Sequence, residues 1–369
     1  MKALNNMPIS FPGLFGDLEF NPDPIAIHIG HGVYWYGIIL ALGLLAGLLL
    51  CMKQAKRFGL TEDNVLDMVL WAVPCCILGS RIYYVIFYLD LYRNESGGLD
   101  WSRIIAIWDG GIAIYGTVIA GALVAWIYCK RKKLKFGALT DLCVMGLLIG
   151  QAIGRWGNFM NREAFGTATT LPWRMRLWTS AYEYIEVHPT FLYESLWNVT
   201  GLCLMLLIVT KARRFDGENT WFYFLWYGLG RAWVEGLRTD SLYLFDWTLF
   251  GEPIRVSQAL SLVMALVAAV MLFYNIRIKK HNPEELLVNR RRAELALAAA
   301  DAEAIASLTE EPGSPAEEAM DAASPPEEPP AGNAGASPRP ETEEPPAGET
   351  ETPPASEEDG TLTGEDRTT

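Results

Sequence analysis

The sequence lacks every cysteine pattern that would hold a metal ion or form a disulfide framework. Its six cysteines include no C-x-x-C pair; Cys75 and Cys76 are directly adjacent, and the others are well separated. All of them lie within or at the ends of apolar runs, where free cysteine behaves as a small buried hydrophobe. We therefore expect the cysteines to be buried, and the sequence predicts no metal site and no cofactor.

An excess of positive charge is also missing. The net charge is −13, and it comes from the end of the chain, because residues 301–369 hold 19 acidic and 2 basic residues. The preceding residues are slightly positive, so the acidic balance describes a tail. This distribution excludes an acidic soluble enzyme, and it equally excludes a basic domain that binds nucleic acid.

The tail is also rich in proline, with 12 of the 21 prolines after Thr309. Such a composition buries too little apolar surface to offset the entropy lost on ordering, so residues 309–369 are predicted to be disordered in the cytoplasm. Before the tail, residues 283–308 are dominated by Ala, Leu and Glu and predict a cytoplasmic helical extension. The remaining residues, 1–282, form the predicted membrane domain.

Long apolar runs dominate this predicted membrane domain. A helix needs about 20 apolar residues to cross the hydrocarbon core of a membrane. Seven runs approach or exceed that length, so the sequence predicts an all-α integral membrane protein with seven transmembrane helices. The predicted spans cover residues 33–52, 65–89, 112–129, 139–160, 190–210, 219–237 and 256–276.

Lysine and arginine are unevenly distributed between the loops on the two sides. Fourteen follow the first, third, fifth and seventh spans, whereas seven lie in the loops of the opposite side. Cytoplasmic loops carry the excess of these residues, so the N-terminus is predicted to be outside and the C-terminus inside. Because no small-residue cleavage site accompanies the first apolar run, we expect no cleaved signal peptide.

Glycines recur at four-residue steps in two of the predicted spans. Gly43 and Gly47 lie in the first span, and Gly146, Gly150 and Gly154 line one face of the fourth. Small residues at this spacing let helix backbones approach closely in a membrane. We therefore expect close helix packing along these glycine faces.

Ionisable side chains inside the spans are the most informative feature of the chain. Each costs roughly 2.5–3.5 kcal/mol on insertion scales, and such residues usually serve a function. With the predicted orientation, they lie near the outer leaflet, together with Tyr36, Tyr115 and His188. For Arg231 and Glu235 a structural alternative exists, because residues four apart on one helix face can neutralise each other. The ionisable residues in question are Arg81, Arg155, Glu194, Arg231 and Glu235.

Two or three arginines in a partly dry site predict binding of phosphate, because the planar guanidinium matches phosphate oxygens and stays charged. At the level of the outer headgroups, such a phosphate belongs to a phospholipid. Asn158, Asn161 and Glu163 add hydrogen-bonding groups near Arg155, and glycines such as Gly166 let the backbone approach a ligand. The residues alone therefore predict a multi-pass protein that handles an anionic lipid headgroup from outside.

The stretch GRWGNFMNREAFG, from Gly154 to Gly166, narrows this prediction. It resembles the signature G-R-x-G-N-F-x-N-x-E-x-x-G of the prolipoprotein diacylglyceryl transferase family. The similarity covers residues 30–276 in order and leaves out the tail. It continues in WYG (35–37), GSRIYYVIFY (79–88), HPTFLYES (188–195) and YGLGRAWVEGLRTD (227–240).

The resemblance implies a reaction, its substrates and a location. Members of this family transfer the diacylglyceryl group of phosphatidylglycerol to the thiol of the lipobox cysteine in the signal peptide of a preprolipoprotein. A thioether forms and glycerol phosphate leaves. The implied partners are phosphatidylglycerol, the lipobox peptide and membrane lipids, and the implied location is the bacterial cell membrane, with the active site facing the outer leaflet.

The resemblance also implies roles for particular residues. Arg155 matches the arginine that holds the phosphatidylglycerol headgroup, and Tyr36 matches an essential tyrosine of the first span. Arg231 matches an important arginine of the sixth span, and arginines placed near the departing phosphate stabilise its growing negative charge. The predicted headgroup site also includes Asn158, Glu163, Gly166, Glu235 and Arg81.

One position departs from the family pattern. After the Gly-Gly of the third span many members carry a histidine regarded as the base for the thiol, whereas the matching residue here is Tyr115. A free cysteine thiol has a pKa of about 8.5, so a base or positive surroundings must generate the thiolate. Tyrosine, with a pKa of about 10, needs a neighbouring guanidinium to do so. Either Tyr115 takes the proton, or His188 does.

Two other classes of protein fit parts of the sequence. Seven spans with internal arginines suit a transporter or binding protein for an anionic solute, but the chain has no internal repeat and no pair of matching interrupted helices. A CDP-alcohol phosphotransferase would need a D-G-x-x-A-R metal motif, and Asp109-Gly110-Gly111 lacks the downstream acids. The diacylglyceryl transferase is therefore the favoured interpretation.

Overall fold

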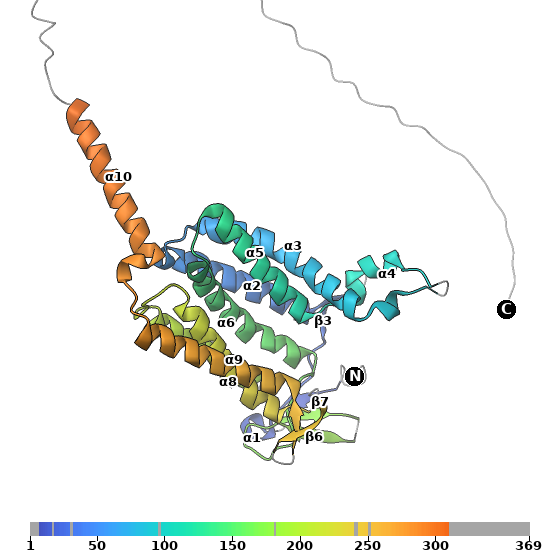
Figure 1. Ribbon diagram of the computed structural model, residues 1–369. Coiled ribbons are helices and arrows are strands. Elements are labelled where there is room, and N and C mark those ends of the chain that lie inside the picture. The colour runs from blue at the N-terminus through green and yellow to red at the C-terminus, as the bar shows by residue number, and fades with distance from the viewer. Residues whose placement is uncertain are drawn as a thin grey trace, which may run out of the picture. The chain divides into compact units, whose positions relative to one another are not determined.

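The computed structural model describes residues 7–16, 18–29, 32–94, 97–180, 182–239, 243–249 and 252–309. Most of these residues are helical, and the long helices lie side by side except α10, which projects away from the others (Figure 1). The long helices are α2 (Trp35–Gln54), α3 (Glu62–Phe87), α5 (Ile114–Lys132), α6 (Phe136–Met160), α7 (Thr190–Leu204), α8 (Glu218–Leu237), α9 (Val256–Phe273) and α10 (Leu287–Thr309). Shorter helical segments are α1 (Pro12–Phe15), η2 (Ala55–Phe58), η3 (Leu89–Tyr92), α4 (Trp101–Ile105), η4 (Ile107–Asp109), η5 (Met205–Val209), η6 (Tyr274–Ile278) and η7 (Pro283–Glu285).

Five of the described helical stretches are long and apolar enough to cross a membrane. Two further helices coincide with predicted spans but are less apolar: α5 ends in three consecutive cations, and α8 carries Arg231 and Glu235 among its apolar residues. The structure therefore supports a mainly helical membrane protein with five candidate spans. These candidates are Trp35–Phe58, Glu62–Phe87, Phe136–Met160, Thr190–Val209 and Val256–Ile278.

The prediction of an all-α protein is wrong in one respect, because short strands lie at one end of the helices. Four of them form an antiparallel sheet in the order β2-β1-β5-β6, and two hairpin-like pairs, β3-β4 and β7-β8, lie outside it. A small apolar cluster that includes Ile9, Leu177 and Phe191 packs beneath the sheet. The strands are β1 (Ile9–Ser10), β2 (Glu19–Phe20), β3 (Ile25–Ile27), β4 (Val33–Tyr34), β5 (Met175–Trp178), β6 (Tyr184–Val187), β7 (Tyr243–Leu249) and β8 (Glu252–Arg255).

Local sequence sets where two of the long helices begin and end. The hydroxyl of Thr61 accepts a hydrogen bond from the backbone N–H of Asn64, whose side chain accepts one from Thr61 in return, so α3 starts with a capping box. At the other end of the α2 segment, Gly59 takes a φ of +73° and lies against the backbone of Val288. Only glycine fits this position without strain.

The glycine faces of α2 and α6 pack against each other, which confirms the predicted close packing. A Cβ atom on Gly47 would lie 2.9 Å from the carbonyl oxygen of Gly146, and one on Gly43 would lie 3.1 Å from that of Gly150. The two backbones therefore touch over a full turn of each helix. This contact holds the ends of α2 and α6 in register, and both ends contribute to the site described below.

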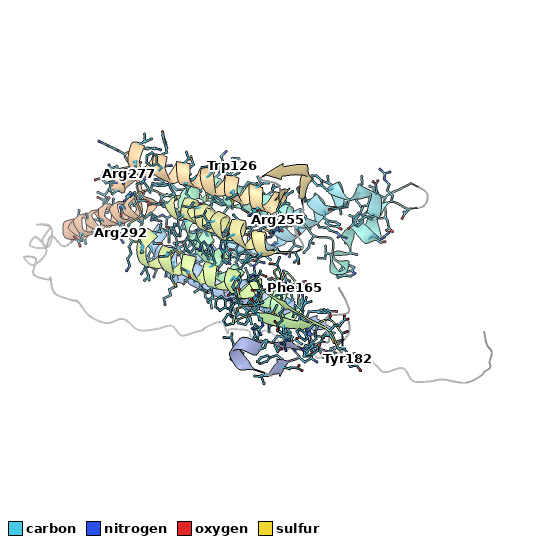
Figure 2. The ribbon with its side chains drawn as sticks, turned by 90° about the horizontal axis from the view of Figure 1, so that it is seen from below. Trp126, Phe165, Tyr182, Arg255, Arg277 and Arg292 are labelled. Atoms are coloured by element: carbon cyan, nitrogen blue, oxygen red, sulfur yellow. The ribbon has the colours of Figure 1, made fainter. Side chains whose placement is uncertain are left out.

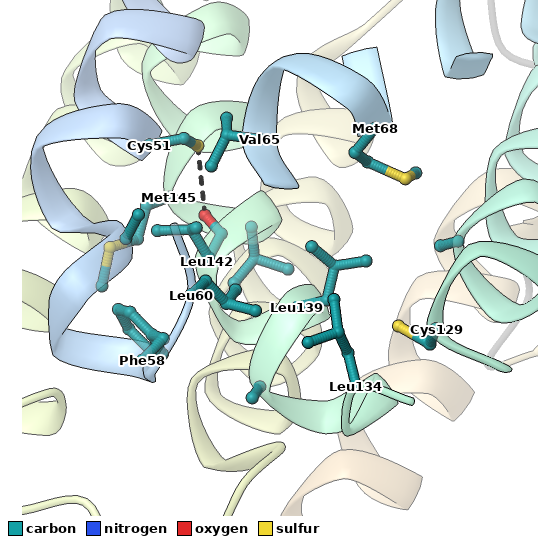
Figure 3. Close-up of a cluster of buried hydrophobic side chains, with 14 of the residues drawn as sticks. Cys51, Phe58, Leu60, Val65, Met68, Cys129, Leu134, Leu139, Leu142 and Met145 are labelled. Atoms are coloured by element: carbon teal, nitrogen blue, oxygen red, sulfur yellow. Dashed lines mark hydrogen bonds between the residues drawn. The ribbon is translucent and has the colours of Figure 1, made fainter. Parts of the chain in front are cut away.

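Most of the buried apolar side chains gather near the opposite end of the helices, close to the start of α10 (Figure 3). Phe58, Leu139 and Met145 are almost fully buried there. The thiol of Cys51 donates to the carbonyl oxygen of Leu142 at 3.4 Å, as Figure 3 shows. The expectation of buried cysteines holds only in part: Cys51 and Cys129 are buried, Cys75, Cys76 and Cys143 are half-buried, and Cys203 is exposed.

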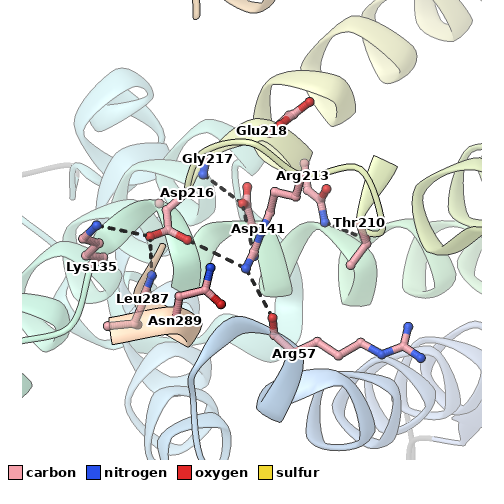
Figure 4. Close-up of polar contacts among 12 residues, drawn as sticks. Arg57, Lys135, Asp141, Thr210, Arg213, Asp216, Gly217, Glu218, Leu287 and Asn289 are labelled. Carbon is pink, nitrogen blue, oxygen red and sulfur yellow. Dashed lines mark hydrogen bonds and ion pairs between the residues drawn. The ribbon is translucent and has the colours of Figure 1, made fainter. Parts of the chain in front are cut away.

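A polar network at this end joins the turn before α8 to the start of α10 (Figure 4). The fully buried carboxylate of Asp141 accepts from the backbone N–H groups of Gly217 and Thr220 at 2.8 and 2.9 Å. The Arg213 guanidinium lies 3.8 Å from it. Asp216 accepts from the N–H of Leu287, the first residue of α10. The proposed tail, residues 309–369, lies beyond the described residues except for Thr309.

The sheet and the start of α10 thus mark the two ends of the helical body. Figure 2 shows Phe165 and Tyr182 near the sheet and Arg277 and Arg292 near the other end. We call these the sheet end and the α10 end. The ionisable residues singled out from the sequence lie on the halves of their helices that lead to the sheet end.

Candidate active site

Two tryptophans lock α7 to α8. The indole N–H of Trp197 donates to the carbonyl of Trp226 and that of Trp226 to the carbonyl of Trp197, both at 2.9 Å, with the rings stacked 4.4 Å apart. Each indole lies over a glycine of the other helix, so a Cβ on Gly201 or Gly230 would collide with a ring. This interlock fixes the two helices beside their charged residues.

A second contact fixes α7 against α6. The indole N–H of Trp156 donates to Ser195 Oγ at 3.3 Å, and the Ser195 hydroxyl donates to the carbonyl of Ala152 at 2.9 Å. Arg155 and Glu194 are the sequence neighbours of these two anchors. Their side chains are therefore held close together by ordinary helix packing.

Charged residues of three helices meet at this point. Glu194 on α7 lies between the two arginines, with Oε2 2.6 Å from Arg155 Nη2 and Oε1 3.7 Å from Arg231 Nη1. Glu235 Oε2 lies 2.7 Å from Arg231 Nη2. The carboxylate side chains are 8% and 3% exposed and those of the arginines about 20%, so the cluster is largely shielded from solvent. In this environment a charge interacts more strongly than it does in water.

The cluster carries two positive and two negative charges. The pair of Arg231 and Glu235 considered from the sequence is therefore one of two close ion pairs, and the other joins Arg155 to Glu194. One buried donor of the cluster lacks a hydrogen-bond partner in the described part of the chain. Nη1 of Arg231 is buried and has no hydrogen-bond partner among the described residues. The guanidinium of Arg255 reaches the same place and donates to the carbonyl oxygens of Glu235 and Arg238. The arrangement is that of an anion site that can accept a further oxygen.

The signature turn after α6 holds a second carboxylate. Glu163 Oε1 accepts from the side-chain amides of Asn158 at 2.9 Å and Asn161 at 3.4 Å. Asn158 lies three residues after Arg155, on the same side of α6.

The turn itself is held by Arg162, which has a φ of +52°. Its buried guanidinium donates to the carbonyl oxygens of Met7 and Pro22 and to the side chain of Asn21.

Gly166 joins this turn to α8 and to the sheet. Its N–H donates to the carbonyl of His188 at 3.0 Å, and the N–H of Thr167 donates to the carbonyl of Leu237 at 2.7 Å. A Cβ on Gly166 would lie 2.7 Å from the His188 Cβ and 3.1 Å from the Thr190 side chain. Glycine is needed here because three chain segments meet, and this need arises from packing.

Tyr36 lies at the start of α2, with its half-buried ring against Gly157. A Cβ on Gly157 would lie 2.6 Å from Cδ2 of that ring, so the signature glycine makes the contact possible. Gly157 follows Arg155 by two residues. The structure therefore brings the Tyr36 ring to the same end of α6 as the arginine cluster.

Arg81 lies apart from this cluster and is fully engaged. Its five N–H groups point to five backbone carbonyls of one loop, and the side chain is buried. Nε donates to Ile104, Nη1 to Gly110 and Gly111, and Nη2 to Arg103 and Ala106, at 2.6 to 3.1 Å. The predicted headgroup role of Arg81 therefore receives no support from this geometry, because no donor is left for a phosphate.

Tyr115 is half-exposed at the start of α5. Gly116 packs against the backbone of α3, and the Tyr115 ring lies 6.1 Å from the ring of Tyr83. No hydrogen bond or ion pair joins Tyr115 to the arginine cluster among the described residues. The structure thus places Tyr115 at the sheet end but not in contact with Arg155 or Arg231.

His188 is held by a short chain of hydrogen bonds. The Trp173 indole donates to the Tyr193 hydroxyl at 2.8 Å, and that hydroxyl lies 3.1 Å from His188 Nδ1. If the Tyr193 hydroxyl donates this hydrogen bond, Nδ1 of His188 is the acceptor and Nε2 carries the imidazole proton. Burial lowers the pKa of His188 below its ordinary value, so the ring is neutral at neutral pH.

The structure brings together Arg155, Arg231 and Glu235 from the predicted site, and places Tyr36, Asn158 and Glu163 beside them. It leaves Arg81 and Tyr115 outside the cluster. The residue that sequence reasoning failed to assign is Glu194, which joins the two arginines. Its presence inside an apolar run was the available signal, but the sequence did not reveal its partners.

The fold and this cluster define a helical membrane protein with an arginine–carboxylate site at one end of its helices. The chain matches the prolipoprotein diacylglyceryl transferase family over residues 24–274. It belongs to this family and is a transferase, which confirms the resemblance found in the signature.

Three relatives named phosphatidylglycerol–prolipoprotein diacylglyceryl transferase illustrate the similarity. The one from Listeria monocytogenes is 43% identical over 270 residues, which cover 71% of this chain and 92% of the relative. The one from Finegoldia magna is 41% identical over 259 residues, or 70% and 96%. The one from Bacillus licheniformis is 44% identical over 260 residues, or 68% and 92%. Each of the three alignments is longer than the five candidate spans and the strands of the sheet combined.

Proposed function

We propose that this chain transfers the diacylglyceryl group of phosphatidylglycerol to the lipobox cysteine of a preprolipoprotein, the first step of lipoprotein maturation. The observation that carries the proposal is the pair of arginines, Arg155 and Arg231, held together at one end of the helices and partly open to an anion. A phosphodiester at the membrane surface fits this pair in charge and in hydrogen-bonding geometry.

The main contribution of the protein to the proposed reaction is to place charged groups beside the reacting atoms. The thiol loses its proton, and the thiolate sulfur attacks carbon 3 of the glycerol that carries the acyl chains. A C–S bond forms while the C–O bond to the phosphate breaks, and its electron pair leaves with glycerol phosphate. Negative charge grows on that phosphate during the step, so Arg155 and Arg231 stabilise the transition state more than the starting lipid.

We propose the same roles for the neighbouring residues as the family signature implies. Asn158 and Glu163 orient the turn next to Arg155 and offer polar groups to the glycerol headgroup, and Glu235 holds Arg231. Gly166 lets the turn, the sheet and α8 meet. Tyr36 closes the α2 side of the site. For Arg81 the geometry favours a different role, because all its donors hold the loop between Arg103 and Gly111.

The base that accepts the thiol proton remains a choice between Tyr115 and His188. The accepting nitrogen of His188 is occupied by the Tyr193 hydroxyl in the hydrogen-bond order given above. Tyr115 is half-exposed and open to a substrate that arrives from the side of α3 and α5. We therefore favour Tyr115.

We further propose that α5 and α8 complete a set of seven spans. Their 19 and 20 residues make helices of about 29 and 30 Å, close to the thickness of a hydrocarbon core. In this arrangement residues 1–282 are the membrane domain, residues 283–308 a cytoplasmic extension and residues 309–369 a disordered tail. The sheet end, with the active site, faces the outer leaflet of the bacterial cell membrane, and the excess of cations at the α10 end supports this orientation.

The direct test is a reaction with purified full-length protein. The protein in detergent is incubated with phosphatidylglycerol and a synthetic lipobox peptide, and the thioether product is sought by mass spectrometry. We expect a peptide heavier by one diacylglyceryl group, no product with a peptide whose cysteine is replaced by serine, and no loss of activity on addition of EDTA. A protein that binds the lipid but never modifies the peptide would favour the binding-protein alternative.

A further inference from the structure

Glu194 is the only described carboxylate that contacts both arginines of the site. It comes from α7, whereas Arg155 lies on α6 and Arg231 on α8. Its side chain is 8% exposed, so its charge is balanced mainly by these two guanidinium groups. A carboxylate buried in this way is costly unless it is paired. We therefore ask which function the Glu194 carboxylate has between the two arginines.

The two contacts of Glu194 differ in kind. The 2.6 Å distance to Arg155 is that of a short, charge-assisted hydrogen bond. The 3.7 Å distance to Arg231 is too long for a hydrogen bond, and Nη1 of Arg231 has no other hydrogen-bond partner among the described residues. A phosphate oxygen that enters the cluster can therefore pair with Arg231 without displacing a hydrogen bond, whereas it must compete with Glu194 for Arg155.

The charges of the cluster make this competition unavoidable. The two arginines are already balanced by Glu194 and Glu235. A lipid phosphodiester adds one further negative charge to a partly dry site, where like charges repel strongly. The phosphate and the Glu194 carboxylate therefore compete for the same two guanidinium groups.

We propose that Glu194 is the internal counter-ion of the phosphate site. In the empty site it holds Arg155 and Arg231 at a fixed separation. It yields their N–H groups to the phosphate of the lipid and takes them back when glycerol phosphate leaves. This inference rests on the proposed function, and it makes Glu194 a positioning residue that acts through the arginines.

The benefit of such a counter-ion lies in product release. A phosphodiester carries a single charge, whereas a phosphomonoester such as glycerol phosphate carries about −1.5 to −2 at neutral pH. Two uncompensated arginines would therefore bind the product more tightly than the substrate. A carboxylate that competes for the same donors weakens product binding more than substrate binding, and so it keeps the enzyme turning over.

The test variant is Glu194→Gln, which keeps the length of the side chain and one acceptor but removes the competing charge. We expect glycerol phosphate to inhibit this variant roughly 5- to 150-fold more strongly than the wild type, the usual range for coupling between two interacting sites. We also expect a lower KM for phosphatidylglycerol and a lower kcat, because release of the product slows. A purely structural role predicts the opposite change in KM.

Glu194→Asp separates charge from reach. It retains the negative charge, so inhibition by glycerol phosphate should stay near that of the wild type, although turnover falls because the shorter side chain spans only one arginine. If the Gln variant does not fold, this variant decides. The proposal would be overturned if glycerol phosphate inhibited the Asp variant as strongly as we expect it to inhibit the Gln variant.

The chain offers a matched control in Glu186→Gln. Glu186 also lies between two arginines, Arg174 and Arg176, with a 2.7 Å contact to each, but it belongs to the sheet and not to the cluster. Loss of its charge should leave inhibition by glycerol phosphate unchanged. A shift equal to that of Glu194→Gln would mean that any bridging carboxylate affects the anion, which contradicts a local competition.

A binding measurement keeps this inference separate from the proposed function. Thermal unfolding of the detergent-solubilised protein is followed with increasing glycerol phosphate, since at a given concentration a ligand of the folded state raises the unfolding temperature more the more tightly it binds. Tighter binding by the Gln variant supports the counter-ion even if no thioether forms, which would overturn only the proposed function. Equal binding by both folded proteins, or binding by neither, would overturn the counter-ion.

Discussion

Arg155 is the single side chain on which the proposed chemistry depends most directly. Its guanidinium presents a planar fork to phosphate, whereas an ammonium group is a compact point charge. We expect Arg155→Lys to lower kcat/KM roughly 10²- to 10³-fold, the cost of removing one preorganised donor from a growing oxyanion. The measurement is the initial rate of thioether formation at several phosphatidylglycerol concentrations.

Arg176→Lys is the control for this prediction, because Arg176 holds Glu186 on the sheet at 2.7 Å and lies outside the cluster. It should retain activity close to that of the wild type. Near-normal turnover of Arg155→Lys itself would show that Arg155 acts only as a distant charge.

Tyr115 provides a second test at the scale of one residue. If it removes the thiol proton, Tyr115→Phe should slow the reaction roughly 10²- to 10⁴-fold at neutral pH. The loss should shrink as the pH approaches 9, because the thiolate then forms unaided. Tyr115→His should keep activity and move the pH optimum downward, since histidine titrates near 6.5. A tenfold loss that is the same at every pH would instead assign Tyr115 a role in holding the headgroup.

At this scale the sequence identified which residues are costly but not how they are used. Arg155 and Arg231 were identified because a charged side chain inside an apolar run is costly, and the structure brings the two arginines together through Glu194. Arg81 stood out for the same reason, yet its partners are five carbonyls of a loop more than twenty residues away. Backbone acceptors leave no trace in side-chain patterns. The link from Glu194 to both arginines likewise depends on how three helices pack.

At the scale of the element, the interlock between α7 and α8 sets the geometry of the cluster. Gly230 lies under the indole of Trp197 and directly precedes Arg231. We expect Gly230→Ala to destabilise the protein by about 1–3 kcal/mol, the usual cost of overpacking, and to lower activity because Arg231 moves away from Glu194. Thermal unfolding in detergent and the rate of thioether formation measure the two effects.

Gly236→Ala in the same helix is the matched control. Among the residues that the structure describes, a Cβ there would meet only the Gln258 side chain, at 3.6 Å, so the substitution should be neutral or slightly stabilising, as expected when alanine replaces glycine in a helix. If both alanine variants lose the same stability, the effect belongs to α8 as a whole and the interlock does not explain it.

Apolar runs predicted the long helices well, because a helix in a membrane must satisfy its backbone internally and the run alone carries that information. The glycine steps predicted close helix packing, because small residues let backbones touch, and the structure shows that the two helices in contact are α2 and α6. The sheet could not be predicted. Its strands are two to four residues long, and Ile9 pairs with Leu177, which lies far away in the sequence. So short a segment has no readable period, and its pairing depends on the helices that bring its ends together.

At the scale of the whole molecule, the two ends of the helical body carry different kinds of polar group. The sheet end holds arginines and carboxylates in a largely buried cluster. The α10 end holds many more lysines and arginines in its loops, and a buried network around Asp141 and Arg213 that ties the turn before α8 to α10. Both ends hold a buried guanidinium nitrogen without a hydrogen-bond partner among the described residues, on Arg213 and on Arg231. The two ends differ in exposure, because the Arg213 side chain is 4% exposed and those of Arg155 and Arg231 are about 20% exposed. This difference supports the proposed assignment of the active site to the sheet end.

The orientation of these two ends in the membrane gives the last prediction. Tyr182 lies in the loop between β5 and β6 and is 94% exposed, and Arg131 lies exposed in the last turn of α5. In a variant whose exposed Cys203 is replaced by serine, Tyr182→Cys should react with a membrane-impermeant thiol reagent in intact cells, and Arg131→Cys should react only after the membrane is permeabilised. The reason is that lysines and arginines resist transfer across the membrane, so we expect the α10 end to stay inside and the sheet end, with its proposed anion site, to meet the outer leaflet. The reverse labelling pattern would place the arginine cluster at the inner leaflet, and it would then be unable to reach a lipobox cysteine on the outer side of the membrane.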